Sequence, residues 1–210
     1  MMDMVEAIRQ VREVFKPDTY FEAYPKHFNR YIGTDVHVLE IGVYRGGSLE
    51  LWRDFFGPEA MIYGVDWEDK GLDVEDEQIE ILIADVNKAG SMEMIKTEFP
   101  RVDIVIDDCG HDMDQQKRLF MNLYPHVSPN GIWVTEDVYT SYWGSLYNPT
   151  GERTFIEYTK DLIDELMAVR KPDHSLEGVT DFTLSAGSIH YYPGLFIVEK
   201  QVRRIADLVV

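Results

Sequence analysis

Five short apolar or β-branched runs recur along this chain, and they limit its possible folds more than any other feature. Short, mainly apolar runs are typical of strands that are buried on both faces of a sheet. The runs are Val36–Ile41, Met61–Val65, Ile79–Ile83, Val102–Ile106 and Gly131–Thr135. The intervals hold an acidic loop from Asp66 to Gln78 and helix-like stretches at Gly47–Phe56, Lys88–Phe99 and Met113–Tyr124. This alternation predicts a doubly wound α/β sheet that is mostly parallel.

The two ends of the chain complete the predicted domain. Apolar residues at Met4, Ile8, Val11 and Phe15 have helical spacing, and this helix should end before Pro17. Residues 17–35 are mixed and aromatic, so they are expected to be irregular or helical, and either to lie over a pocket or simply to pack. We therefore expect an N-terminal helical cover over residues 1–35 and a catalytic part over residues 36–210, together forming a single domain.

The C-terminal third predicts one more helix and two more strands. Glu152–Arg170 has helical periodicity and is closed by Pro172. Strands are predicted at Val179–Ser185 and Leu195–Glu199, with Gly187 and the Pro193-Gly194 pair as breakers. These two strands are expected to form an antiparallel terminal pair, which brings the sheet to seven strands.

Charge and cysteine content exclude some classes of partner. The 210 residues include 38 Asp and Glu against 20 Lys and Arg, a formal charge of −18, so a nucleic acid would be repelled over most of the surface. Cys109 is the only cysteine, so no intramolecular disulfide is possible, and a reducing cytoplasm is expected. Charges within Met1–Lys16 argue against a signal peptide, and no run has the length of a membrane span.

The segment Val38–Ser48 is a predicted strand that runs into a glycine-rich turn and then a helix, where open α/β sheets bind ligands. Its spacing, G-x-x-x-G-G from Gly42 to Gly47, differs from the G-x-G-x-x-G of dinucleotide sites. Glycines there let the backbone approach a ligand closely, and the helix N-terminus suits an anionic group. Glu40 would suit an ammonium group, so the turn is matched to an amino-acid zwitterion.

Two acidic residues follow the next strands. Asp66 ends the second strand, where a carboxylate can accept hydrogen bonds from both ribose hydroxyls of an adenosine, and Asp85 ends the third, where it could face the adenine amino group. Taken singly, such a glycine turn is more often only a turn, and such an aspartate more often a helix cap. In order, however, these features from Val36 to Lys200 resemble the class I S-adenosylmethionine-dependent methyltransferases.

That resemblance implies a Rossmann-like sheet and assigns several contacts. Glu40, Gly42 and Gly46 would surround the methionine part of S-adenosylmethionine. Asp66 would bind ribose and Asp85 would lie near adenine. Asp107 is expected either to contact the cofactor or to hold its own loop.

A second group of carboxylates follows the fourth and fifth strands, in Asp107-Asp108-Cys109-Gly110-His111 and Glu136-Asp137. Neighbouring parallel strands lie about 5 Å apart, so these carboxylates can converge, and they would repel one another without a cation between them. Hard oxygen ligands favour Mg²⁺, or Mn²⁺ in its place, over zinc. The alternative interpretation is that the aspartates cap the following helix and that Glu136 and Asp137 are solvated loop residues.

The Asp108-Cys-Gly-His111 and Trp133-Val-Thr-Glu-Asp137 segments resemble the metal-dependent sugar O-methyltransferases of antibiotic biosynthesis, including the macrocin, rhamnosyl and cephalosporin-hydroxylase-like group. The resemblance implies Asp108, Glu136 and Asp137 as metal ligands and His111 as the catalytic base. Several members of that group carry an additional N-terminal domain, whereas about 35 residues precede the first strand here. The acceptor and the oligomeric state therefore stay open, with a homo-oligomer as one alternative.

These features predict an enzyme that moves a methyl group from S-adenosylmethionine to a hydroxyl of a sugar or glycosylated small molecule. A catechol-type or other small-molecule O-methyltransferase is the first alternative, although catechol enzymes typically have lysine where His111 stands. A nicotinamide-dependent oxidoreductase is the second, and the absent G-x-G-x-x-G counts against it. Aromatic residues after the metal motif could form an acceptor wall or simply pack, and His27 could be a pocket-lid residue. The aromatic residues are Tyr139, Tyr142, Trp143 and Tyr147.

Overall fold

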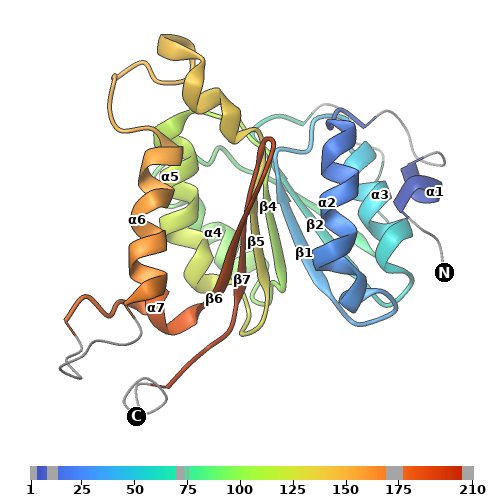
Figure 1. Cartoon of the computed structure of the whole chain (residues 1–210). Coiled ribbons are helices and arrows are strands. Elements are labelled where there is room, and N and C mark those ends of the chain that lie inside the picture. Colours follow the sequence, from blue (N-terminus) through green and yellow to red (C-terminus); the bar gives the residue numbers. More distant parts are fainter. Residues whose placement is uncertain (1–3, 9–13, 70–73, 75, 169–176, 205–210) are drawn as a thin grey trace.

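The computed structural model describes residues 4–8, 14–69, 74, 76–168 and 177–204. They form a seven-stranded sheet in the order β3-β2-β1-β4-β5-β7-β6 (Figure 1). Strands β1 to β5 are parallel, β7 is antiparallel to β5, and β6 is antiparallel to β7. The predicted doubly wound sheet with an antiparallel end is thereby confirmed. The strands are β1 His37–Ile41, β2 Met61–Asp66, β3 Ile79–Ile83, β4 Ile104–Asp107, β5 Ile132–Thr135, β6 Ala186–Tyr192 and β7 Leu195–Lys200.

Helices cover both faces of the sheet (Figure 1). One face carries α1 (Met4–Ile8), α2 (Asp18–Phe28) and α3 (Gly47–Phe56). The other carries α4 (Ser91–Glu98), α5 (Met113–Leu123) and α6 (Phe155–Met167), with the short α7 (Asp181–Ser185) nearby. Four single-turn 3₁₀ helices join these elements in the described residues. They are η1 Asn29–Tyr31, η2 Tyr124–His126, η3 Val138–Tyr142 and η4 Gly144–Leu146.

Alternate residues of the central strands enter two separate apolar layers. Val38, Ile106 and Val134 belong to the layer under α2 and α3. Leu39 and Val105, their neighbours in sequence, belong to the layer under α5 and α6. Because both faces are covered, the strands are apolar at nearly every position, which explains the continuous runs in the sequence.

One predicted strand is wrong. The segment Val179–Ser185 contains helix α7, and the strand β6 begins only at Ala186. A reciprocal capping box between Thr180 and Thr183 starts the helix and satisfies its first backbone donors. Gly187, expected to break a strand, lies within β6, where a Cβ would come 2.8 Å from Cβ of Gln201.

Within the predicted N-terminal cover, the residues of α2 form a helix. Of the helix predicted from Met4 to Phe15, residues 4–8 are helical and residues 9–13 lie outside the described part, but Val14 and Phe15 are not helical, so the predicted end at Phe15 is wrong. The end predicted for α6 near Arg170 and Pro172 also lies outside it. Within the described residues, no helix combines the length and apolar character needed to cross a lipid bilayer.

The order of the strands fixes where a ligand can bind. The chain direction across the sheet reverses between β1 and β4, because β2 and β3 lie on one side of β1 while β4 and β5 lie on the other. At such a switch point the loops after the two central strands diverge and leave a crevice at their carboxyl ends. The turn after β1, which carries Gly42 and Gly46, and the loop after β4, which carries Asp108 and His111, border this crevice.

Candidate active site

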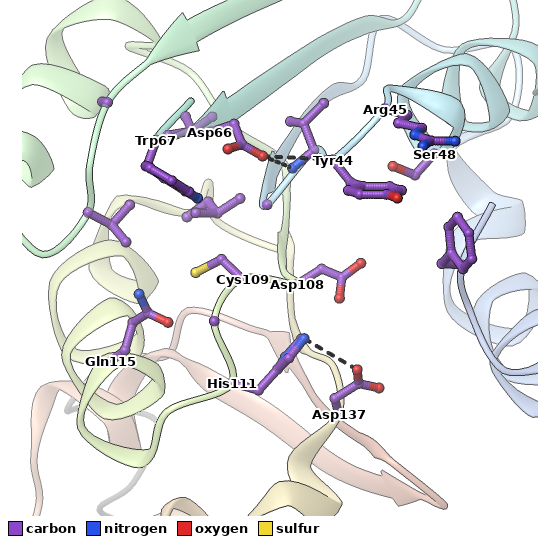
Figure 2. Close-up of a pocket in the computed structure, with 18 of the residues that line it drawn as sticks. Tyr44, Arg45, Ser48, Asp66, Trp67, Asp108, Cys109, His111, Gln115 and Asp137 are labelled. Atoms are coloured by element: carbon purple, nitrogen blue, oxygen red, sulfur yellow. Dashed lines mark hydrogen bonds and ion pairs between the residues drawn. The ribbon is translucent and has the colours of Figure 1, made fainter. Parts of the chain in front are cut away.

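A cavity of about 700 Å³ opens at the carboxyl ends of β1, β2 and β4 (Figure 2). This volume lies within the range of small-molecule sites, about 300–1,000 Å³. Its walls come from residues 14–16, the glycine turn after β1, the ends of β2 and β3, residues 108–111 and Asp137. The cavity therefore brings together loops that are far apart in the sequence.

The turn after β1 needs glycine at the position nearest the cavity. Gly42 lines the cavity with φ +95°, and a Cβ there would lie 2.2 Å from the backbone oxygen of Asp108. The turn and the loop after β4 can approach each other only because Gly42 has no side chain. Gly46 has φ +82° and is the N-cap of α3, so it shapes the turn without lining the cavity.

Asp66 lies where a ribose-binding carboxylate was predicted. Its Oδ2 accepts hydrogen bonds from the backbone N–H of Val43 and of Tyr44, each at 3.0 Å, and its Oδ1 accepts one from Glu68 N–H at 3.2 Å (Figure 2). Asp66 thus ties the glycine turn to β2 while it lines the cavity. Asp85 also lines the cavity, and its Oδ1 accepts from Asn87 N–H at 2.9 Å.

Three carboxylates lie on the face of the sheet that α2 covers. Glu40 follows Val38 by two residues, Asp108 follows Ile106, and Glu136 follows Val134. Side chains two residues apart along a strand share a face, and the three apolar residues belong to the layer under α2. The pleat therefore gathers Glu40, Asp108 and Glu136 within 4.8 Å of one another.

Asp137 forms a second, overlapping group with Asp108 and His111, again within 4.8 Å. The structure thus places Asp108 next to both other predicted metal ligands, Glu136 on the buried side and Asp137 on the cavity side. The described side chains engage Oδ2 of Asp108 and Oε1 of Glu136, and they leave the second oxygen of each without a hydrogen-bond partner. Hard oxygen donors with free lone pairs fit Mg²⁺.

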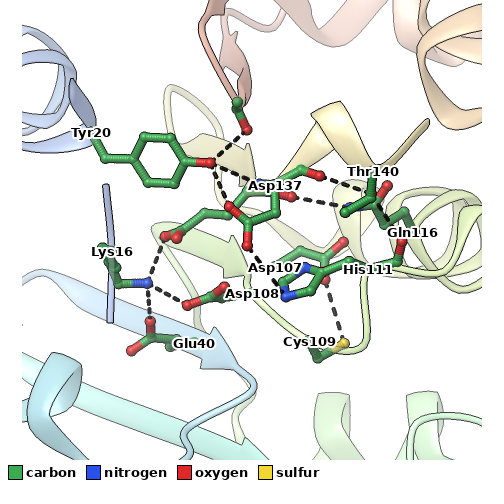
Figure 3. A network of polar contacts seen from close by, with 12 residues as sticks. Lys16, Tyr20, Glu40, Asp107, Asp108, Cys109, His111, Gln116, Asp137 and Thr140 are labelled. Carbon is green, nitrogen blue, oxygen red and sulfur yellow. Dashed lines mark hydrogen bonds and ion pairs between the residues drawn. The ribbon is translucent and has the colours of Figure 1, made fainter. Parts of the chain in front are cut away.

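Lys16 inserts a buried ammonium into this cluster (Figure 3). Its Nζ lies 2.9 Å from Oε1 of Glu40, 2.5 Å from Oδ2 of Asp108 and 2.7 Å from Oε1 of Glu136. Burial by itself would lower the pKa of Lys16, but Asp108, Glu136 and Glu40 raise it well above the ordinary value. The ammonium is therefore charged, and one positive charge faces three carboxylates.

Two buried phenols of α2 complete the same side of the site. Tyr24 donates to Oε1 of Glu136 at 2.5 Å, and Tyr20 donates to Oδ1 of Asp137 at 2.6 Å. Burial is the main cause that raises the pKa of both phenols, so they act as donors. Gly194 makes room for Tyr20, since a Cβ there would lie 2.3 Å from the phenol oxygen.

His111 faces Asp137 across the cavity edge, with 3.4 Å between its Nε2 and Oδ2 of Asp137 (Figure 3). Its backbone has φ +52°, and its carbonyl accepts from Thr140 Oγ1 at 3.1 Å. Its Nδ1 is buried without a hydrogen-bond partner among the described residues. An imidazole held on a constrained loop beside two carboxylates can accept a proton from a ligand in the cavity.

Three predicted site residues lie behind the cavity wall. Glu40 is fully buried, and its second oxygen accepts from Trp52 Nε1 at 3.1 Å. Asp107 is also buried, and burial raises its pKa well above the usual range. Glu136 is buried beside Lys16 and Tyr24. None of the three lines the cavity, so any contact of Glu40 or Asp107 with a ligand there is indirect in this arrangement.

Cys109 lines the cavity and donates from its Sγ to Oδ1 of Asp107 at 3.5 Å. Burial, and then the charge of Asp107, raise the pKa of the thiol well above its ordinary value. A protonated thiol is a poor nucleophile and a poor metal ligand. Cys109 is therefore a packing residue of the loop.

Lys16 was not predicted as a site residue, and Tyr20 and Tyr24 were left undecided between a pocket and packing. Tyr20 and Tyr24 lie four apart and share one side of α2, but Lys16 precedes the N-cap Pro17, so no helical spacing indicated its position. His27, in contrast, does not line the cavity. It contacts Glu199 at 2.6 Å and Tyr192 at 3.0 Å, and Arg30 holds the other oxygen of Glu199, so this group docks α2 on the β6–β7 hairpin.

The aromatic residues predicted either to form an acceptor wall or to pack lie in η3 and on both sides of η4. Tyr139, Trp143 and Tyr147 contact one another through ring centroids 5.1 and 5.5 Å apart. Tyr142 is 74% exposed and Trp143 is 55% exposed. Aromatic faces exposed near a polar cavity can bind the apolar face of a ring.

Relatives of known sequence are sugar O-methyltransferases. Demethylmacrocin O-methyltransferase of Streptomyces fradiae is 34% identical over 190 residues, covering 85% of this chain and 48% of the relative. The 8-demethyl-8-alpha-L-rhamnosyl tetracenomycin-C 2'-O-methyltransferase of Streptomyces olivaceus is 31% identical over 204 residues, covering 93% and 53%. No family model matches the chain.

A solved methyltransferase structure is also similar to this chain. The MycE methyltransferase from the mycinamycin biosynthetic pathway, in complex with Mg, SAH and mycinamycin VI, is 31% identical. It aligns with a TM-score of 0.79 and covers 95% of this chain and 55% of its own. The chain thus spans about half the length of the relatives it matches.

Proposed function

We infer that this chain, which belongs to the S-adenosylmethionine-dependent methyltransferases and is related to their sugar O-methyltransferases, transfers a methyl group to a hydroxyl of a sugar or glycosylated small molecule. One observation carries the proposal. Asp108, His111 and Asp137 converge at one side of a cavity whose other side presents Asp66 and the glycine turn. A methyl donor and a hydroxyl acceptor can therefore meet in one site.

The donor would bind along the glycine turn. Asp66 would accept hydrogen bonds from the ribose hydroxyls, and Asp85 would lie near the adenine. Gly42 would allow the methionine part to approach the backbone, and Gly46 would shape the turn that makes this approach possible. The carboxylate of Glu40, which lies behind the cavity wall, would attract the ammonium group of the methionine part without touching it. For Asp107, burial favours the role of holding the loop over contact with the donor.

Asp108, Glu136 and Asp137 would hold the divalent cation, which we propose to be Mg²⁺ or Mn²⁺. The second oxygens of Asp108 and Glu136, which have no hydrogen-bond partner among the described side chains, and the excess of carboxylates over the Lys16 charge support this assignment. A bound divalent cation supplies positive charge that acidifies an acceptor hydroxyl. The relative described as a complex with Mg and SAH supports the same pair of cofactors.

His111 would act as the general base. Its imidazole takes the hydroxyl proton while the acceptor oxygen attacks the methyl carbon of the sulfonium. A C–O bond forms, the C–S bond breaks, and the products are the methyl ether and S-adenosylhomocysteine. The fixed loop conformation of His111 supports this role, because a base held in place loses little freedom in the transition state.

We propose a small-molecule acceptor in the cytoplasm, and no nucleic-acid or membrane partner. The net charge of −18 supports the first exclusion, and the exposed rings of Tyr142 and Trp143 suit a glycoside with an apolar body. The domain boundary near residue 35 and a homo-oligomeric state remain parts of the same proposal. No observation favours the oxidoreductase alternative.

The decisive experiment incubates the purified chain with S-adenosylmethionine, Mg²⁺ and a panel of macrolide and polyketide glycosides beside simple catechols. Mass spectrometry should find S-adenosylhomocysteine together with an acceptor heavier by one methylene unit. Methylation of catechols alone would favour the catechol-type alternative. Binding of a nicotinamide cofactor with no binding of S-adenosylhomocysteine would reject the proposal.

A further inference from the structure

Lys16 places a positive charge inside the carboxylate cluster, and methyl transfer as proposed makes no use of it. The Lys16 side chain is 2% exposed, and its Nζ contacts Asp108 and Glu136, two of the three proposed metal ligands. The ammonium and a divalent cation would therefore share the same two carboxylates. Such sharing is a direct electrostatic competition, because both cations gain their stabilisation from the same negative charges.

Lys16 lines the cavity, and its contacts hold its ammonium within the carboxylate cluster. Glu40, which is not a proposed ligand, binds Nζ at 2.9 Å and is itself fixed by Trp52 at 3.1 Å. The backbone that follows Lys16 is anchored as well, because Tyr20 and Tyr24 donate to Asp137 and Glu136. The lysine thus enters the cluster from the segment just before α2, and Asp108 and Asp137 line the same cavity as Lys16.

The number of charges determines how tightly such a site binds a cation. Glu40, Asp108, Glu136 and Asp137 supply four negative charges when ionised, and Lys16 reduces the total to three. In oxygen-ligand sites the ligand charge count is one of the main determinants of affinity for divalent cations. A fixed ammonium next to two ligands therefore lowers that affinity.

We propose that Lys16 is a positioning residue that sets the affinity of the site for its divalent cation. In the metal-free protein the ammonium holds Asp108 and Glu136 together against their mutual repulsion. When the metal binds, the same ammonium repels it and keeps the affinity moderate. This inference rests on the proposed metal site and adds a residue that tunes it.

The test is calorimetric titration of Mg²⁺ into metal-free protein at one mildly alkaline pH. Lys16→Met removes the charge with similar side-chain volume, and Lys16→Gln removes it but keeps N–H donors for the carboxylates. Each variant should bind Mg²⁺ at least about tenfold more tightly than the parent, because repulsion between a single and a double charge a few ångströms apart exceeds that factor even with water-like screening. Lys16→Arg keeps the charge and should stay within a few-fold of the parent.

A matched control is Lys26→Met, which changes an exposed lysine of α2 whose ammonium lies over the Tyr192 ring. It should leave Mg²⁺ affinity unchanged.

Thermal melting adds a readout that does not depend on turnover. Metal-free Lys16→Met should melt below the parent, and Mg²⁺ should raise its melting temperature more than that of the parent.

The outcomes separate this inference from the proposed function. Unchanged or weaker Mg²⁺ binding in both neutral variants, with normal binding in the parent, overturns the role of Lys16 and leaves the metal site intact. Binding in the neutral variants but not in the parent supports the role of Lys16 and overturns metal use by the natural protein. Absence of Mg²⁺ binding in every folded variant overturns both.

Discussion

Asp66 offers the sharpest test of the proposed donor site, because its two carboxylate oxygens accept hydrogen bonds from different groups. Oδ2 accepts from the N–H groups of Val43 and Tyr44, whereas Oδ1 accepts only from Glu68 N–H at 3.2 Å among the described residues. In Asp66→Asn the amide oxygen can replace Oδ2 and keep the glycine turn in place. The amide NH₂ group then replaces Oδ1, the acceptor proposed to face the ribose.

The expected loss follows from the bonds removed. Hydrogen bonds to a charged group contribute about 1.5–3 kcal/mol, so Asp66→Asn should weaken binding of S-adenosylhomocysteine about tenfold to a hundredfold. Asp66→Ala also removes the acceptor for Val43 and Tyr44, so its loss should be larger. Its melting temperature should fall too, because two backbone donors lose their partner.

Isothermal titration calorimetry of both variants with S-adenosylhomocysteine gives the dissociation constants, and thermal melting reports the fold. Equal affinity of the parent and of folded Asp66→Asn would show that the carboxylate only ties the glycine turn to β2. Weakened binding in Asp66→Ala with unchanged binding in Asp66→Asn would lead to the same conclusion. Either result would refute the ribose assignment.

Three further predictions concern catalysis, metal and pH. Asparagine suits the left-handed backbone of His111 at φ +52°, so His111→Asn should keep the loop conformation. This variant should lower kcat at least about a hundredfold, while its affinity for S-adenosylhomocysteine changes less than a few-fold. Near-normal turnover would assign the role of general base to another residue. Removal of the metal with a chelator should abolish methyl transfer and lower the melting temperature, and added Mg²⁺ should restore both. Full activity of the demetallated protein would contradict the metal assignment. Burial lowers the pKa of Lys200 to about 8, so the folded protein loses this proton before the unfolded chain does. The free energy of unfolding should therefore rise with pH from about 8 toward the ordinary lysine pKa of about 10.4, and Lys200→Met should flatten that rise in pH-dependent urea melts.

The strands and the residues that line the cavity were predictable because parallel-sheet geometry is simple. Carboxyl ends of parallel strands meet at one edge, so Asp66, Asp85, Asp108 and Asp137 were expected there, and all four line the cavity. The sequence could not separate Asp107 from Asp108 without the strand register. In the structure β4 ends at Asp107, whose side chain is buried, and the next residue faces the cavity.

The C-terminal strand was misplaced for a local reason. Val179–Ser185 has β-branched and aromatic residues that suit a strand, but the Thr180–Thr183 capping box and the burial of Phe182 favour one helical turn. Strand propensity is weak evidence over so few residues, since packing against neighbours decides the outcome. The β7 prediction survived because its residues are buried on both faces between β5 and β6.

Lys16 shows where prediction from sequence ends. The pleat places Glu40, Asp108 and Glu136 on one face of the sheet, and this much follows from their even spacing from Val38, Ile106 and Val134. The right-handed crossover rule fixes the face on which α3 lies, because α3 connects two parallel strands. No such rule applies to α2, which precedes β1 and could have packed on either face. Only the observed packing of α2 beside α3 brings Tyr20 and Tyr24 of the helix, and Lys16 just before it, into contact with the carboxylate cluster.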